Sequence, residues 1–189
     1  MLVSPTVWED TVKVICTTNT TWAQTIAMVG RIVNAYGSPW TTDPTRHAFP
    51  TPQQIAAVPF DEFAATAKLG YRNAAVHSLA VDIAERKLDL ESLRDTDLDS
   101  QTLWKRLLAL RGVGPYAASC LLLYLGRPER VNADSWARML LGKELGRPVT
   151  DKDVHDFFAP YGEWRGLVYN FYGWRREKIL TSGQKLFTS

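Results

Sequence analysis

The stretch Leu110-Arg-Gly-Val-Gly-Pro-Tyr116 joins two apolar patterns that have helical spacing. Gly112 and Gly114 predict a tight turn with exposed amide groups, because glycine reaches backbone conformations that other residues avoid. Pro115 suits the first position of the next helix, where a backbone N–H would have no partner. Amide groups at a helix N-terminus attract anions, so the turn could hold a phosphate without reading a base. A Gly-x-Gly turn is by itself also typical of an ordinary helix connection.

A second stretch, Val131-Asn-Ala-Asp-Ser-Trp-Ala-Arg138, places an aspartate at the start of another helical pattern. Asp134 follows Tyr116 by eighteen residues, across an apolar run and a short Gly-Arg-Pro turn. Aspartate is favoured at the N-cap, where its carboxylate accepts hydrogen bonds from the first turn. The usual role of such a residue is helix capping, and a catalytic role is the alternative.

Apolar residues recur at helical spacing along most of the chain, whereas the alternation typical of strands is hard to find. This pattern predicts an all-α protein of about ten helices joined by short turns. The clearest runs are Trp8, Val12, Ile15; Trp22, Ile26, Val29, Ile32, Val33, Tyr36; and Ala75, Leu79, Ile83.

Helix boundaries are marked by capping residues. Ser4-Pro5 and Thr51-Pro52 each place a hydroxyl before a proline, which predicts a helix start. Gly37, Gly126 and Gly146 suit helix ends.

The C-terminal part of the chain is rich in aromatic residues and then becomes basic. This segment predicts a packed final helix with a basic fringe. It comprises Trp164, Tyr169, Phe171, Tyr172 and Trp174, followed by Arg175, Arg176 and Lys178.

The 189 residues, 46% of them hydrophobic, suffice for one compact core or two small lobes. No apolar run approaches the roughly 18 residues of a membrane span, and the start of the sequence lacks a signal-peptide pattern. We therefore expect an intracellular protein, in the cytoplasm and nucleoid or in the nucleus. The two cysteines, Cys16 and Cys120, have no metal-ligand spacing, so we expect reduced thiols.

The net charge of +2 is unevenly distributed. Residues 1–99 contain 8 Lys and Arg against 12 Asp and Glu, whereas residues 100–147 contain 8 against 3, a local charge of +5. A basic segment is often a solvated surface, but it is also typical of contact with a phosphate backbone.

The hairpin, the apolar helix, the Gly-Arg-Pro turn and the aspartate at a helix start together resemble the helix-hairpin-helix (HhH-GPD) DNA glycosylases. The motifs are most similar to those of 8-oxoguanine and 3-methyladenine glycosylases. The resemblance implies two helical lobes that flank a DNA-binding cleft, with Asp134 as the catalytic carboxylate. It implies that four hairpin residues bind DNA: Arg111, Gly112, Val113 and Gly114.

The same resemblance implies a single glycosylase domain over residues 1–189. We expect one lobe at about residues 20–133, and the other to combine about residues 1–19 with residues 134–189.

Further motifs match the 8-oxoguanine subgroup. Asn19 would occupy the gap left by the extruded nucleotide, Tyr71 would intrude beside the opposite base, and Arg72 would contact that base. The resemblance places the base pocket at Cys120, with Tyr116 and Trp136 beside it. Without the resemblance, Asn19 would be read as a helix cap and Tyr71 as a half-buried ring.

Departures from the family pattern narrow the expected chemistry. Tyr116 stands where strand-cleaving relatives have the lysine that forms a Schiff base, so we expect a monofunctional hydrolase. Gln24 replaces the arginine that reads the opposite cytosine, which puts that preference in doubt. No cysteine follows Cys120, so no iron–sulfur cluster is expected. Relatives usually carry further chain upstream of this sequence.

The expected partner is double-stranded DNA with a damaged or mispaired base, bound by a monomer. No cofactor or metal is expected; a monovalent cation held by hairpin carbonyls is the one ion considered. The alternatives are a DNA-binding module without enzymatic activity and a helical protein-interaction domain.

Overall fold

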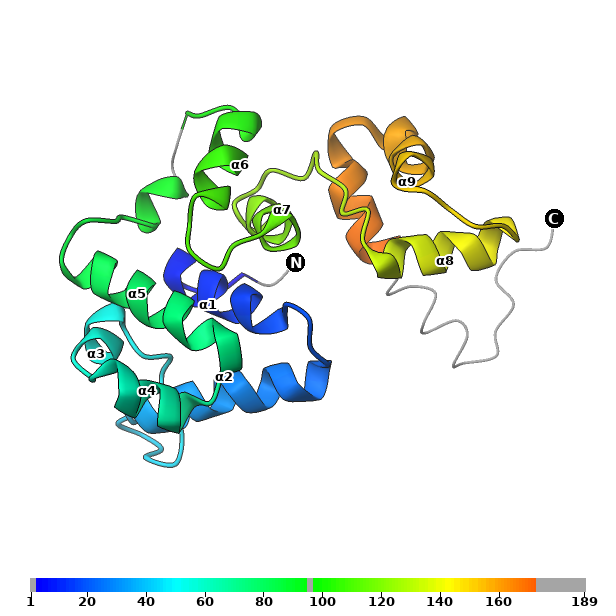
Figure 1. Ribbon diagram of the computed structural model, residues 1–189. Helices are drawn as coiled ribbons and strands as arrows, with labels where there is room; N and C mark the ends of the chain where they lie inside the picture. The colour runs from blue at the N-terminus through cyan, green and yellow to red at the C-terminus, as the bar shows by residue number, and fades with distance from the viewer. Residues whose placement is uncertain (1–2, 95–96, 173–189) are drawn as a thin grey trace. The chain divides into compact units, whose positions relative to one another are not determined.

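The computed structural model describes residues 3–94 and 97–172, and its regular elements are helices (Figure 1). Within these residues the only β-type pairing is an isolated bridge between Pro39 and His47. The predicted all-α fold is confirmed. The α-helices are α1 (Val7–Thr17), α2 (Trp22–Tyr36), α3 (Pro52–Ala56), α4 (Phe60–Ala67), α5 (Asn73–Ala84), α6 (Ser100–Leu108), α7 (Pro115–Tyr124), α8 (Ser135–Leu145) and α9 (Asp151–Phe158). Three 3₁₀ helices, η1 (Gly70–Arg72), η2 (Glu91–Leu93) and η3 (Ala159–Trp164), and a helical segment at 165–172 complete the described chain.

The chain divides into two compact units, Met1–Leu125 and Gly126–Ser189. The first unit contains α1 to α7, and α1 packs against both α2 and α7 (Figure 1). Its core is formed by apolar side chains that recur every three or four positions, as the sequence pattern predicts. The largest fully buried side chains of this core are Ile15, Ile32, Ile55, Phe63, Leu69, Leu79, Leu90, Leu103, Leu107, Leu121 and Leu122.

Helix α1 starts two residues later than the Ser4-Pro5 pair predicts. Thr6 is the N-cap, and its hydroxyl accepts a hydrogen bond from Glu9 N. Ser4 instead donates its amide to the carboxylate of Asp10. The prediction at Ser4 is wrong because the hydroxyl of Thr6, and not that of Ser4, lies within reach of the first turn. Thr51, Gly37 and Gly146 lie at helix ends as predicted, and Gly126 follows the C-cap of α7.

The placement of α1 differs from the predicted division into lobes. We expected residues 1–19 to join the C-terminal segment, but Val12 and Ile15 are buried in the same core as Leu121 and Leu122 of α7. This packing removes the apolar face of α1 from water within the first unit. The difference arises because sequence periodicity identifies a buried helix face without showing which neighbour covers it.

The second unit has a smaller core of its own. Val131, Leu141, Val154 and Phe158 are buried, and Tyr169 and Tyr172 pack their rings edge-on against Phe158. The predicted C-terminal helix is present from residue 165 to residue 172, with part of its aromatic face packed. Trp174 and the basic residues after it lie outside the described residues. None of the described helices combines the length and hydrophobicity of a membrane-spanning segment.

We predict that burial of Cys16 makes stability depend on alkaline pH. The side chain has no exposed surface, and burial raises the pKa of its thiol to about 11. Because the unfolded thiol ionises at lower pH, the stabilisation is complete below about pH 9 and is lost as the pH rises toward 11. Ionisation of this thiol should lower the free energy of unfolding by about 2 kcal/mol over that range. Urea unfolding at several pH values would measure it, and Cys16→Ala should flatten this part of the decline. Parallel pH profiles for the two proteins would contradict the prediction.

Candidate DNA-binding and catalytic site

The predicted hairpin is formed by α6, the turn at residues 109–114 and α7. Gly112 has a φ of +81°, and a Cβ at this position would lie 2.5 Å from the Cβ of Ala75 in α5. Both the backbone conformation and the packing therefore require glycine here. Val113 is buried beside it and donates its amide to Leu110 O (3.1 Å), which closes the turn.

Gly114 differs from Gly112, because nothing within the protein requires a glycine there. Its φ is −91°, it is exposed, and a Cβ would meet no atom within 4 Å. Gly114 is the N-cap of α7, which begins with Pro115 and has no side-chain hydrogen bond at its cap. The bare backbone of this helix start therefore faces solvent, where an external group can approach closely.

Asp134 lies in the second unit as the N-cap of α8. Its Oδ1 accepts hydrogen bonds from Ala137 N (2.7 Å) and from the Tyr169 hydroxyl (3.3 Å). No hydrogen bond to Oδ2 comes from the part of the chain that the structure describes. The side chain is half-buried. Capping and catalysis are therefore compatible, because one oxygen anchors the carboxylate and the other can face a substrate.

The loop before Asp134 is held by the start of the C-terminal helical segment. Gly166 donates its amide to Pro128 O (2.7 Å), and the guanidinium of Arg165 donates to Glu129 O. A Cβ at residue 166 would lie 2.0 Å from Arg130 O, so only glycine permits this approach. On the other side, Arg138 donates to Ala133 O (2.7 Å). These contacts fix the backbone that leads into Asp134.

The predicted wedge residues come together in the first unit. The amide of Asn19 donates to the Tyr71 hydroxyl (3.5 Å), and Asn19 itself has a φ of +44°. The Tyr71 ring is 67% exposed, as a residue that inserts into DNA requires. Arg72 is only 7% exposed, and its guanidinium is bonded to the backbone of the neighbouring turns. Its expected contact with the opposite base would have to come from a guanidinium whose three nitrogens all donate within the protein here.

The residues expected at the base pocket lie in both units. Tyr116 and Cys120 are one turn apart on α7, and Tyr124 continues this face. Burial raises the pKa of Tyr124, with smaller contributions from Cys120 and Asp10. In the second unit, the ring of Trp136 packs edge-on against Tyr169, with 6.2 Å between centroids.

A cleft of about 750 Å³ lies between α1, α2 and the end of α7. Its lining includes Tyr124, together with Trp22 and Ile26, which are 72% and 57% exposed. The sequence motifs point to neither Trp22 nor Tyr124 as a site residue. The helical spacing of Tyr124 from Cys120, and the position of Trp22 three residues after Asn19, are the signals that could have found them.

A smaller, polar hollow of about 450 Å³ lies next to the wedge residues. Its lining includes Asn19, Gln24, Arg31 and Lys68. The side-chain oxygen of Gln24 accepts a hydrogen bond from Thr21 N (3.2 Å), as part of the capping box of α2.

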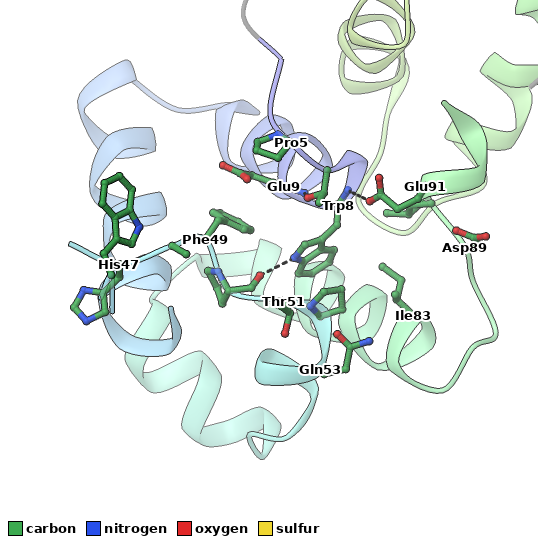
Figure 2. Close-up of a pocket in the computed structure, with 16 residues that line it drawn as sticks. Pro5, Trp8, Glu9, His47, Phe49, Thr51, Gln53, Ile83, Asp89 and Glu91 are labelled. Carbon is green, nitrogen blue, oxygen red and sulfur yellow. Dashed lines mark hydrogen bonds between the residues drawn. The ribbon is translucent and has the colours of Figure 1, made fainter. Parts of the chain in front are cut away.

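A third pocket, of about 690 Å³, contains none of the predicted site residues (Figure 2). Trp8 lines it and donates its indole N–H to Pro50 O (2.9 Å). The carboxylate of Glu91 accepts hydrogen bonds from the backbone amides of Val7 and Trp8. These contacts anchor the start of α1. Over residues 3–94 and 97–172, no group of three or more His, Cys, Asp or Glu side chains is arranged to hold a metal ion.

Comparison with known proteins identifies the family. The sequence model of the HhH-GPD superfamily of base excision DNA repair proteins matches residues 12–165, which is most of the chain. The chain belongs to the HhH-GPD superfamily. The matched region contains the hairpin, Asp134 and the wedge residues, so the resemblance drawn from these motifs is confirmed.

Curated members of the HhH-GPD superfamily are similar over part of their length. The chain is 30% identical over 142 residues to a probable bifunctional transcriptional activator/DNA repair enzyme AlkA from Mycobacterium tuberculosis, covering 74% of this chain and 27% of that protein. It is 32% identical over 117 residues to a probable N-glycosylase/DNA lyase from Methanothermobacter thermautotrophicus, covering 59% of this chain and 36% of that protein. The chain therefore spans about a third or less of the length of these relatives.

A solved structure has the same fold. The 8-oxoguanine glycosylase/lyase of Clostridium acetobutylicum, in complex with double-stranded DNA containing cytosine opposite 8-oxoguanine, matches with a TM-score of 0.76. The sequences are 21% identical, and the match covers 92% of this chain and 61% of that one.

We predict that the two hairpin glycines have separable roles. Gly112→Ala should lower the free energy of unfolding by about 3 kcal/mol, because it adds both backbone strain and a steric clash. Gly114→Ala should change stability by less than about 0.5 kcal/mol. It should nevertheless weaken duplex DNA binding by about tenfold, since a methyl group would block close approach to the helix start. Thermal unfolding and fluorescence-anisotropy titrations at fixed salt would measure both effects. Unchanged DNA affinity in Gly114→Ala would contradict the assignment.

Proposed function

We propose that this protein is a monofunctional DNA glycosylase of base excision repair. It hydrolyses the N-glycosidic bond of a damaged or mispaired base that has left the duplex stack. The observation that carries the proposal is Asp134, a carboxylate that the described residues hold at the start of α8 through Oδ1 alone, in a chain of the HhH-GPD superfamily.

Cleavage of an N-glycosidic bond develops positive charge on the sugar, as glycoside hydrolysis does. A carboxylate held beside the anomeric carbon stabilises that charge, and it can also orient and deprotonate the attacking water. The helix amide and the Tyr169 hydroxyl restrain Asp134, so little reorganisation is needed when charge develops. Both roles use Oδ2 of Asp134, which accepts no hydrogen bond from the described residues.

The hairpin supplies the DNA anchor in this proposal. The exposed backbone at Gly114 and the start of α7 would receive a phosphate, and Arg111 adds positive charge at the same turn. Phosphate contacts position the duplex without selecting a sequence, which suits an enzyme that must examine every base pair.

We assign the extruded base to the α7 face that carries Tyr116, Cys120 and Tyr124, and to the adjoining cleft with Trp22. Exposed aromatic side chains stack on bases of any sequence, which favours a pocket that recognises shape and electronic character. Asn19 and Tyr71 would occupy the space that the base leaves, and this offsets part of the free-energy cost of unstacking.

We predict that Asp134→Asn abolishes excision without unfolding the protein. A panel of duplexes, each with one oxidised, alkylated, deaminated or mismatched base, would be incubated with enzyme and then treated with alkali. The substrate found for the wild type should be processed about a thousandfold more slowly by Asp134→Asn. Stability should change by less than about 1 kcal/mol, because asparagine also caps helices well.

Asp99→Asn is the matched control for this substitution. Asp99 caps α6 and uses both oxygens within the protein, accepting from Gln101 N, Thr102 N and the Thr102 hydroxyl. This variant should retain wild-type activity. If the wild type processes no duplex, or if both variants lose activity equally, the enzymatic proposal fails. Salt-dependent DNA binding without excision would instead indicate a binding module.

We predict that strand cleavage will require alkali. Tyr116 has no amine, and by the resemblance it stands where strand-cleaving relatives have the lysine that forms a Schiff base with the sugar. Borohydride added during the reaction should therefore trap no protein–DNA adduct, and strands should remain intact until base is added. A trapped adduct, as expected for a glycosylase/lyase, would show that another amine of the chain attacks the sugar.

A further inference from the structure

Arg72 is a buried cation that pairs with backbone carbonyls. It is 7% exposed, and no ion pair among the described residues includes it. Its Nη1 donates to Leu69 O (3.2 Å), its Nη2 donates to Thr18 O and to Asn19 O (3.5 Å), and its Nε donates to the Thr18 hydroxyl (3.3 Å). All three nitrogens therefore join the turn at 18–19 to the turn at 69–72.

The same guanidinium supports Tyr71. It lies 4.3 Å from the centroid of the Tyr71 ring, close enough for a cation–π interaction. The exposed ring has little other packing, since 67% of the residue's surface is open to solvent. Arg72 therefore contacts both wedge residues at once, Asn19 through its backbone carbonyl and Tyr71 through its ring.

A chain of side-chain hydrogen bonds connects the two turns as well. The Thr18 hydroxyl donates to Ile15 O (2.8 Å), so its oxygen is left to accept from Arg72 and from the Tyr71 hydroxyl (3.2 Å). The Tyr71 oxygen in turn accepts from the amide of Asn19 (3.5 Å). Asn19 needs such support, because a φ of +44° is uncommon for a residue with a side chain.

We propose that Arg72 is a positioning residue that joins Asn19 and Tyr71 into one preformed wedge. The inference rests on the proposed glycosylase function and adds to it a division of labour. Asn19 and Tyr71 enter the duplex together, and Arg72 stays inside the protein to hold them in register. Arg72 does not read the opposite base, because each of its three nitrogens already donates to the turns and only 7% of the residue is exposed. The opposite base then meets Tyr71, and Arg72 contributes no base preference.

Arg31 provides a matched control. It also donates to backbone carbonyls, from Nε to Ala67 O (2.8 Å) and from Nη2 to Lys68 O (3.0 Å), just before the turn at 69–72. No hydrogen bond from Arg31 reaches Thr18, Asn19 or Tyr71 within the described residues. A general loss of support near residues 67–69 would thus appear in both arginine variants, whereas a wedge defect would appear in the Arg72 variant alone.

The test compares paired and unpaired lesions. Arg72→Gln and Arg31→Gln would be assayed on the best substrate of the duplex panel and on the same lesion in a single-nucleotide bulge. On the paired lesion, kcat/KM of Arg72→Gln should fall by about 10- to 100-fold, as expected for displaced positioning groups. On the bulged lesion, where no base pair must be opened, the loss should be less than about threefold, and Arg31→Gln should resemble the wild type on both.

The opposite base separates a positioning residue from a base-reading one. Arg72→Gln should lose the same factor whichever of the four bases faces the lesion. A loss confined to one opposite base would show that Arg72 reads it, and an equal loss on paired and bulged lesions would show a general folding defect. Either result would overturn the proposal. Asp134→Asn should be inactive on both substrates, so a failure of the wedge proposal is distinct from a failure of the catalytic one.

A binding measurement is independent of catalysis. The probe is a duplex with a tetrahydrofuran abasic analogue and 2-aminopurine as the opposite base, whose fluorescence should change when wild type inserts Tyr71 beside it. Arg72→Gln should lose most of that change while it still binds the duplex. Should Arg72→Gln fail to fold, Thr18→Val removes only the shared hydroxyl and should weaken the signal in the same direction. A full wild-type signal from Arg72→Gln, or from Thr18→Val if that variant is used instead, would contradict the coupling.

Discussion

The contact between the hairpin turn and α5 is the constraint on which the first unit depends. Gly112 approaches Ala75 so closely that residue 112 has no room for a side chain, and Ile15 of α1 lies against the same point. Four helices thereby meet at one turn, because α6 and α7 continue from it and α5 and α1 pack against it. The packing of Gly112 also fixes the position of Gly114, the exposed part of the same turn. The phosphate site that we propose is therefore a surface consequence of core packing.

The second unit uses one carboxylate for two purposes. Asp134 caps α8 through Oδ1. Asp99, which caps α6, accepts hydrogen bonds within its helix on both carboxylate oxygens. This difference in hydrogen bonding, and not the capping position, marks Asp134 as a candidate for chemistry. Tyr169, whose ring packs edge-on against Trp136, supplies it with one hydroxyl donor.

Local features of the fold could be predicted from the sequence, whereas tertiary ones could not. The hairpin boundaries, the N-cap at Asp134 and the glycine helix ends follow from residues within a few positions of each other. The packing of α1 within the first unit could not be predicted, because an apolar stripe on a helix does not show which neighbour covers it. The burial of Arg72 was equally invisible, because it depends on the carbonyls of Thr18 and Leu69 in two separate turns. The helical spacing along α7 places Tyr124 on the same face as Cys120. The cleft that Tyr124 lines could not be predicted in this way, because α1 and α2 form the rest of it.

The close approach of Gly166 to the loop at 128–130 has a consequence for the order of events during synthesis. The loop at 128–130 acquires its contact with Gly166 only after that residue has been added, more than thirty residues after Asp134 itself. The hairpin, in contrast, lies in a unit that ends at residue 125 and has its own core. Because domains generally fold as units from the N-terminus on the ribosome, a nascent chain would complete the unit that contains the hairpin before the unit that contains Asp134.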